Sequence, residues 1–389
     1  MKARSKLRLL LLQLERSIWR EARSCSYTVQ LGIEEGLCAH GVKFLTITTP
    51  WFSEARKICA GRHFDQVWIE IARHETLDDE WLQWVASLAP IRVGFMVESL
   101  EFSPEEQATW SELKIRKQRT ESRLKYVTHV VACDEKDAED INKSGRVSAI
   151  WWPQAVPERF ICHSSAVPAN SHGIFCGSIY GERAKWLEHP DLKGLLTRLP
   201  SPESQTIYPF LFDALHAVVR KFLRRRTSHD DALRALGVKA MALLRQPASA
   251  SAGLFVYMRL LRALRRRCFA LWLEQIRTGA AVVNLPSTVK TYQGRVVEGM
   301  AASCPVISWE IPNRPRNRAL FEDGREILLY PRDNLAHLAD HIRHVVSDLD
   351  FGQQLATNAR HKIRRFHTME RRVEQILAWI ETGEEPSYG

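Results

Sequence analysis

A polar loop that leads into a short helical stretch is the part of the sequence best suited to bind phosphate. An apolar strand expected over 280–285 runs into this loop, and a helix is expected from about Arg295. The N–H groups and positive dipole at a helix start attract anions, and Lys290 and Arg295 would add charged donors. We therefore expect a diphosphate site here. The other residues expected to line it are Thr291, Tyr292, Gly294 and Val296.

A carboxylate, Glu298, lies about one turn into the same helix. It could accept two hydrogen bonds from a ribose diol, so the loop and Glu298 together would hold a nucleotide. Taken alone, a helical glutamate is more often a surface residue in a salt bridge. The neighbouring phosphate motif favours the ribose role.

The elements that must position these residues alternate between strand and helix. In the first 156 residues, short apolar runs are separated by helical stretches, which is typical of strands buried on both faces of a parallel sheet. The expected strands are 7–14, 42–48, 65–71, 91–97, 128–133 and 149–152, and the expected helices are 29–39, 77–88, 104–125 and 135–143. After a Pro- and Ser-containing linker over 157–171, a second series has expected strands at 173–179, 280–285, 305–309 and 326–330.

This pattern predicts an α/β protein with two doubly wound, Rossmann-like domains that face a central cleft. We expect an N-terminal acceptor domain over 1–156 and a donor domain over 172–366. The donor domain would carry a helical, arginine-rich insertion at about 200–278, and a C-terminal helix within 367–389 would cross back to the first domain. Open α/β sheets bind ligands at the carboxyl ends of their strands, which here would meet in the cleft.

The C-terminal half resembles the donor half of group 1 GT-B glycosyltransferases, particularly those related to spore maturation proteins. Three segments carry the resemblance: RVVEGMAASCPVI (295–307), LFEDGREILLY (320–330) and HTMERR (367–372). The resemblance implies a glycosyltransferase that takes a nucleoside-diphosphate sugar as co-substrate, with no cofactor and no bound metal. It also implies that Glu298 holds the donor ribose.

The best-known form of this motif has a second glutamate, eight residues before the first, which contacts the donor sugar. This chain has Lys290 there. The identity of the sugar and the expected retention of anomeric configuration are therefore open on the sequence alone.

The resemblance gives a role to a second segment, GIFCGSIYGERAKWLE (173–188). In such domains a glycine turn after the first strand precedes a basic residue that meets the diphosphate, and Arg183 stands at that place. Gly177 would let the backbone approach phosphate closely because it lacks a Cβ. Ser178 and Tyr180 would line the same site.

Candidate catalytic residues in the first domain follow its strands. Glu98 follows the strand at 91–97 and could act as a general base or stabilise positive charge in the transition state; Asp134 is the reserve, although it reads equally well as a helix N-cap. Trp19, Arg20 and Ser99 are expected at the acceptor. No His, Cys or Asp cluster has the spacing of a metal site.

The chain is basic, with a formal net charge of +10, which favours an anionic partner. The runs KFLRRR (221–226) and RALRRR (262–267) could be solvated helix faces, or could dock on an anionic membrane or on nucleic acid. The acceptor could be a glycan, lipid, protein or nucleic acid. Eight cysteines without C-x-x-C spacing indicate a reducing, cytoplasmic location. A peripheral position on the inner face of the membrane is the alternative.

Two other functions remain open from the residues. One is a nucleotide-sugar epimerase of GT-B shape. The other is a nucleic-acid- or membrane-binding protein without catalytic activity, built on a degenerate transferase fold.

Overall fold

The structure of the chain is a computed structural model. It describes residues 4–13, 28–72, 77–164, 168–177, 179–199 and 250–389.

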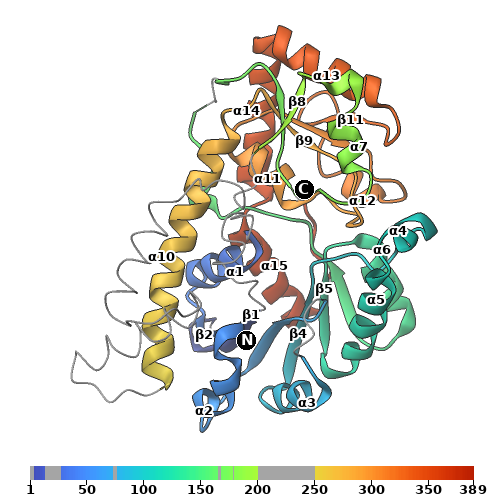
Figure 1. Cartoon of the computed structure of the whole chain (residues 1–389). Coiled ribbons are helices and arrows are strands. Elements are labelled where there is room, and N and C mark those ends of the chain that lie inside the picture. Colours follow the sequence, from blue (N-terminus) through green and yellow to red (C-terminus); the bar gives the residue numbers. More distant parts are fainter. Residues whose placement is uncertain (1–3, 14–27, 73–76, 165–167, 178, 200–249) are drawn as a thin grey trace, which may run out of the picture.

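A six-stranded parallel sheet forms the centre of the N-terminal domain, with strand order β2-β1-β3-β4-β5-β6 (Figure 1). All six strands expected from the apolar runs are confirmed, and they are buried along most of their length as strands covered on both faces must be. Their bounds are β1 (Arg8–Gln13), β2 (Lys43–Thr48), β3 (Gln66–Glu70), β4 (Ile91–Met96), β5 (His129–Ala132) and β6 (Ser148–Trp151).

The helices between these strands follow the expected pattern with one correction. The helix expected over 104–125 is two helices, because Trp110 leaves the helical conformation with φ −141° and ψ 88°. A capping box between Ser103 and Glu106 starts the first of the two. The helices are α1 (Thr28–Ala39), α2 (Ala55–Cys59), α3 (Asp79–Ser87), α4 (Pro104–Thr109), α5 (Glu112–Arg123) and α6 (Glu135–Ser144), with 3-10 turns η1 (Arg4–Lys6), η2 (Thr49–Glu54) and η3 (Leu124–Tyr126).

A second parallel sheet, with order β11-β10-β9-β7-β8, forms the centre of the C-terminal domain. Four of its strands were expected; β8 was missed because its three residues, LTR, contain no apolar run. The strands are β7 (Gly173–Phe175), β8 (Leu196–Arg198), β9 (Ala281–Asn284), β10 (Val306–Trp309) and β11 (Leu328–Tyr330). The helical elements are η4 (Glu158–Phe160), α7 (Arg183–Leu187), η5 (Pro190–Leu192), α10 (Ala250–Ile276), α11 (Gly294–Ala301), α12 (Pro315–Arg318), α13 (Leu335–Ser347), α14 (Leu349–Phe366) and α15 (Met369–Thr382).

The last helix, α15, packs on the N-terminal domain (Figure 1). The chain returns there through a backbone pairing in which Val156 N–H donates to the His367 carbonyl and Met369 N–H donates to the Val156 carbonyl. Thr368 caps α15 by accepting from the Arg371 N–H. Two glycines of α1, Gly32 and Gly36, let α15 approach α1 closely.

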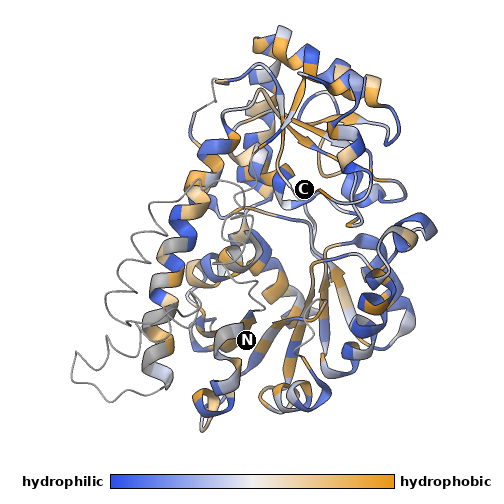
Figure 2. Cartoon of the chain, in the orientation of Figure 1, coloured by the Kyte–Doolittle hydropathy of each residue, from blue (hydrophilic) through white to orange (hydrophobic). Residues whose placement is uncertain are grey.

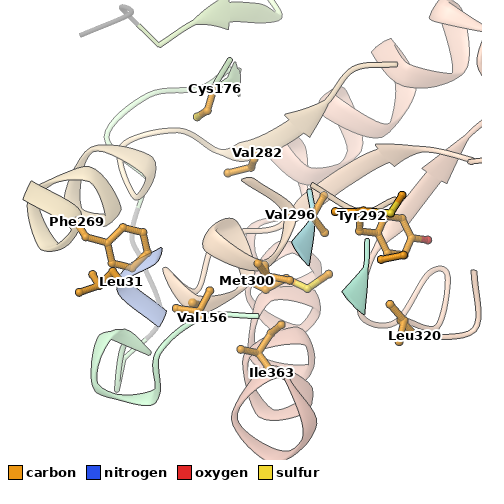
Figure 3. Packing of buried hydrophobic residues seen from close by; sticks show 14 of the residues in the cluster. Leu31, Val156, Cys176, Phe269, Val282, Tyr292, Val296, Met300, Leu320 and Ile363 are labelled. Atoms are coloured by element: carbon orange, nitrogen blue, oxygen red, sulfur yellow. The ribbon is translucent and has the colours of Figure 1, made fainter. Parts of the chain in front are cut away.

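The long helix α10 also reaches the N-terminal domain and runs alongside it (Figure 1). Hydrophilic and hydrophobic residues both occur along its length (Figure 2), and several of its apolar side chains join the core. Phe269 of α10 lies beside Leu31 of α1 (Figure 3), and its ring packs edge-on against Phe160. One buried cluster therefore extends from the C-terminal sheet to α1.

No helix in the described ranges is both long and apolar enough to cross a membrane. The described cysteines are all free thiols.

We expect Gly36→Ala to destabilise the protein by about 1–3 kcal/mol, because an added Cβ overpacks the α1–α15 contact. That Cβ would lie 2.5 Å from Val373 Cγ2 and 2.9 Å from the Met369 carbonyl oxygen. Urea unfolding measures the change. Gly352→Ala in α14, where the nearest atom would be 3.2 Å away, is the matched control; equal losses in the two variants would contradict the packing argument.

Stability should fall as the pH drops below about 6.5, partly through His367. Burial, together with Arg372, holds the pKa of His367 well below its ordinary value of 6.5. Between the two pKa values the unfolded chain binds a proton that the folded chain does not, so the free energy of unfolding decreases by about 1.4 kcal/mol per pH unit for this group.

Unfolding of His367→Asn at pH 7.0, 6.0 and 5.0 checks this contribution. The variant should lose stability less steeply than the wild type as the pH falls. Parallel pH profiles would contradict it.

Candidate active site

The donor loop, defined here as residues 285–293, connects the end of β9 to α11 at the carboxyl edge of the C-terminal sheet. Helix α11 begins at Gly294, as expected, with Gln293 as its N-cap. The Gln293 side chain makes no capping bond and instead donates to Ser287 Oγ. Val296 is fully buried under this helix start and shapes the core.

Two arginine side chains lie next to each other at this edge. Arg183 and Arg295 each place the guanidinium over the Phe175 ring, 5.3 Å and 5.2 Å from its centroid. Burial and the charge of Arg295 lower the pKa of Arg183 to about 9. Burial also lowers the pKa of Arg295. Two buried like charges side by side favour an anion between them.

The described contacts of these arginines are made to neutral oxygens. Arg183 donates to the carbonyls of Pro286 (2.9 Å) and Leu285 (3.5 Å). Arg295 donates to Asn284 Oδ1 (2.9 Å), and no carboxylate of the described residues lies within salt-bridge distance of it.

Gly177 lies against Arg295, so the absence of a side chain matters there. A Cβ at this position would be 2.9 Å from Arg295 Nη2. Ser178, the next expected site residue, lies outside the described residues.

Tyr180 closes one side of the arginine pair. Its ring lies 4.0 Å from the Arg183 guanidinium carbon, and its hydroxyl is 2.6 Å from Ser287 Oγ. Burial alone would raise the pKa of Tyr180, but the charge of Arg183 and the Ser287 hydrogen bond lower it overall. Gly177, Tyr180, Arg183 and Arg295 thus meet at one place.

Glu298 is fully buried, and its Oε2 accepts a hydrogen bond from Trp272 Nε1 at 2.8 Å. Trp272 belongs to α10, so the insertion reaches the carboxylate expected to hold ribose. The simple surface salt bridge considered for Glu298 is wrong, because the side chain has no exposure to solvent.

Three further residues expected at the diphosphate contact other groups. Lys290 Nζ pairs with Glu106 of α4, and its N–H donates to Ser99 Oγ at 2.7 Å. Thr291 Oγ1 and the Tyr292 N–H both donate to Asn317 Oδ1. Ser99, expected at the acceptor, is therefore engaged with the donor loop.

The two candidate catalytic carboxylates are both held by arginines. Glu98 follows β4 as expected and pairs with Arg116 at 3.4 Å, and the Arg116 guanidinium also stacks on Trp110. Asp134 is fully buried and caps α6, as its N-cap interpretation predicted. It also pairs with Arg314 through two guanidinium nitrogens.

Trp19 and Arg20, expected near the acceptor, lie outside the described residues, as does the KFLRRR run. The RALRRR run is in α10, where Arg262 bonds to Glu34, Arg265 to Gln13 and Arg266 to Glu35. These three arginines thus join α10 to the N-terminal domain, a role that neither a solvated face nor an external docking face anticipated.

Sequence reasoning missed the partners that complete the site. Asn284 could have been suspected as a polar residue ending an apolar strand. Trp272, Arg314 and Asn317 lie in segments without a local signal, and they are brought to the site only by tertiary packing.

We expect inorganic pyrophosphate to bind between Arg183 and Arg295. Replacing either with methionine should weaken pyrophosphate binding about tenfold or more, because charge-assisted hydrogen bonds contribute about 1.5–3 kcal/mol each. Isothermal titration calorimetry measures the affinity. Lys185→Met, an exposed cation on α7, is the control; an equal loss in that variant would indicate only non-specific attraction.

Part of the chain matches a known protein family. Residues 255–378 match a family model described as "Glycosyl transferase-like". No curated protein matches the chain by sequence.

Several solved structures share the whole fold at low identity. HepE from Anabaena, solved with UDP-glucose, is 12% identical with a TM-score of 0.54, over 97% of this chain and 100% of that one. Sucrose-phosphate synthase from Thermosynechococcus elongatus is 13% identical with a TM-score of 0.52, over 97% and 98%. An α-glucosyltransferase solved with UDP and a 13-mer DNA containing an HMU base is 9% identical with a TM-score of 0.53, over 97% and 100%.

The two parallel sheets confirm the expected α/β architecture, and these structures identify it as GT-B. The family match covers residues 255–378, so this segment is similar to known glycosyltransferases, and the chain as a whole shares the GT-B fold.

Proposed function

We propose that the donor is a nucleoside-diphosphate sugar bound on the C-terminal domain, with its diphosphate between Arg183 and Arg295. The observation that carries this proposal is the pair of buried guanidinium groups beside the start of α11. A diphosphate would neutralise both charges and could also accept from the first N–H groups of the helix.

UDP is the first nucleotide to test. HepE and the α-glucosyltransferase were both solved with UDP or a UDP-sugar, and both share the fold over nearly their full length. These likenesses support a UDP-sugar donor for this chain, and a thermal-shift screen of nucleotide sugars would identify the base.

In this proposal Glu298 binds the ribose diol. Because Trp272 already donates to one carboxylate oxygen, the indole would orient Glu298 toward the nucleotide and share the carboxylate with the ribose. Glu298 would then be a binding residue whose geometry depends on α10.

Departure of the nucleoside diphosphate requires that its developing negative charge be stabilised. Arg183, Arg295 and the α11 helix start would supply this stabilisation without a metal ion. We therefore propose metal-independent transfer, which activity assays with added EDTA would test.

We also propose retention of configuration at the anomeric carbon. An inverting transfer needs a dedicated base, and the candidate carboxylates, Glu98 and Asp134, are engaged by Arg116 and Arg314. In a retaining transfer the acceptor hydroxyl can pass its proton to the departing diphosphate as the new glycosidic bond forms. Proton NMR of the product would show the configuration.

The acceptor would enter from the N-terminal domain at the carboxyl ends of β4 and β5, where Glu98 and Ser99 lie. Closure around both substrates would exclude water, so transfer would outcompete hydrolysis.

Glu298→Gln should lower the affinity for UDP by about 10- to 100-fold, because a neutral amide accepts weaker hydrogen bonds from the ribose than a carboxylate does. Isothermal titration calorimetry with UDP measures the loss. Glu322→Gln, on the exposed turn of the LFEDGREILLY segment, is the control.

A second variant, and the melting temperature of Glu298→Gln, separate an effect on binding from an effect on folding. Trp272→Phe removes the indole donor while keeping the ring, so it should lower UDP affinity less than Glu298→Gln does. If Glu298→Gln lowers only the melting temperature and binds UDP normally, the ribose assignment is wrong.

A further inference from the structure

Three consecutive residues of the donor loop, Lys290, Thr291 and Tyr292, are connected to the N-terminal domain by hydrogen bonds, either directly or through one intermediate residue. The loop itself belongs to the C-terminal sheet, since it follows β9. Its conformation at these positions therefore depends on the other domain.

Lys290 is held directly, at both its backbone and its side chain. Its N–H donates to Ser99 Oγ at 2.7 Å, and its ammonium group pairs with Glu106. Both side chains of this ion pair are nearly buried, with 11% exposure for Lys290 and 9% for Glu106. Hydrogen bonds and ion pairs shielded from water in this way position their partners more strongly than exposed pairs do.

Thr291 and Tyr292 are held through one intermediate residue, Asn317. Its Oδ1 accepts from Thr291 Oγ1 at 3.2 Å and from the Tyr292 N–H at 3.0 Å. Its own N–H donates to Glu135 Oε2 at 2.5 Å, and the adjacent Arg316 N–H donates to Glu135 Oε1 at 3.1 Å. Both oxygens of Glu135, from α6, are therefore used to place Asn317.

The turn that carries Asn317 is fixed by a second contact between the domains. Arg314 donates to Asp134 and, at 2.8 Å, to Glu101 Oε2. Burial would lower the pKa of Arg314, but these two carboxylates raise it overall, so the guanidinium stays charged. Arg314 thus holds the turn against the N-terminus of α6.

We propose that Ser99, Glu106 and Glu135 of the N-terminal domain are positioning residues for donor-loop residues 290–292, so that the sugar end of the donor site is complete only when the domains are closed. This proposal rests on the proposed donor site. The groups assigned to nucleotide and diphosphate, Arg183, Arg295 and Glu298, bond within the C-terminal half. In the donor loop, Lys290 bonds directly to the other domain, and Thr291 and Tyr292 are linked to it through Asn317. The sugar would lie on the side of the N-terminal domain, because it must meet the acceptor.

The proposal gives Lys290 a different role from the diphosphate contact expected from the sequence. The ammonium group is the anchor of a cross-domain ion pair, and Glu106 brings a carboxylate to the donor loop from the other domain. The effect of changing the charge at position 290 should therefore depend on the charge at position 106.

Amide hydrogen exchange on the full chain without ligand tests the positioning itself. Glu106→Gln removes the charge but can still accept from the Ser103 N–H, so the capping box of α4 survives. Exchange in a peptide covering 287–293 should quicken several-fold in Glu106→Gln and in Ser99→Ala. Glu105→Gln, the exposed neighbour on α4, should leave it unchanged. Unchanged exchange in both test variants would overturn the proposal.

A charge swap tests whether the pair acts as a unit. Lys290→Glu and Glu106→Lys should each speed exchange in the loop by placing like charges together, and the double variant should slow it again toward the wild-type rate. A double variant no slower than the faster single variant would show that the two residues act independently.

Binding of two probes tests the link to the donor. UDP affinity should stay within about twofold of wild type in Glu106→Gln, while UDP-glucose affinity should fall several-fold more than UDP affinity does. Equal losses for both probes would show that Glu106 does not act on the sugar end. If the wild type binds neither probe while loop exchange responds as expected, the donor assignment fails and the positioning role stands.

Discussion

The cost of burying charge governs the region between the two sheets. Arg183 and Arg295 both lie over the Phe175 ring, and the hydrogen bonds described for them include neutral oxygens of Pro286 and Asn284. Such an arrangement is expensive unless an anion completes it. At the contact between the domains, buried cations are instead paired with carboxylates of the protein. Arg314 and Lys290 each form an ion pair with a carboxylate of the N-terminal domain. One set of cations is paired with carboxylates of the protein, and the other is the set that we propose binds a diphosphate.

The fold places these groups through its parallel topology. The carboxyl ends of β7 and β9 bring Gly177 and Asn284 to one edge, and Asn284 in turn orients Arg295. The carboxyl ends of β4 and β5 bring Glu98, Ser99 and Asp134 to the facing edge. Each domain contributes residues at or just after its strand ends. Doubly wound sheets bind their ligands at these carboxyl ends. The domains meet through the loops at these ends, so the contact that joins them also shapes the proposed donor site.

Two helices tie the halves together away from the site. Helix α15 packs on α1 through Gly32 and Gly36. Helix α10 contacts α1 through Phe269 and two arginine–glutamate pairs, and it contacts β1 through the Arg265–Gln13 bond. Trp272 of α10 bonds to Glu298, so this connection extends to the carboxylate that we propose binds the ribose. The arginine-rich composition of α10 is explained in part by these contacts with Glu34, Glu35 and Gln13.

The sequence by itself determined the strand–helix alternation, the two doubly wound sheets and the segment that begins α11. These depend on local hydrophobic pattern and on turn residues such as Gly145, which adopts the expected positive φ of 66° at the end of α6. The proximity of Arg183 to Arg295 could also be predicted from the sequence, because both residues follow strands of one sheet. Only the tertiary structure decided that Lys290 turns to Glu106, that Asp134 is held by Arg314, and that Trp272 reaches Glu298. These partners are separated by 184, 180 and 26 residues along the chain. No periodicity or spacing encodes contacts between segments that become neighbours only through tertiary packing, within one domain or between the two.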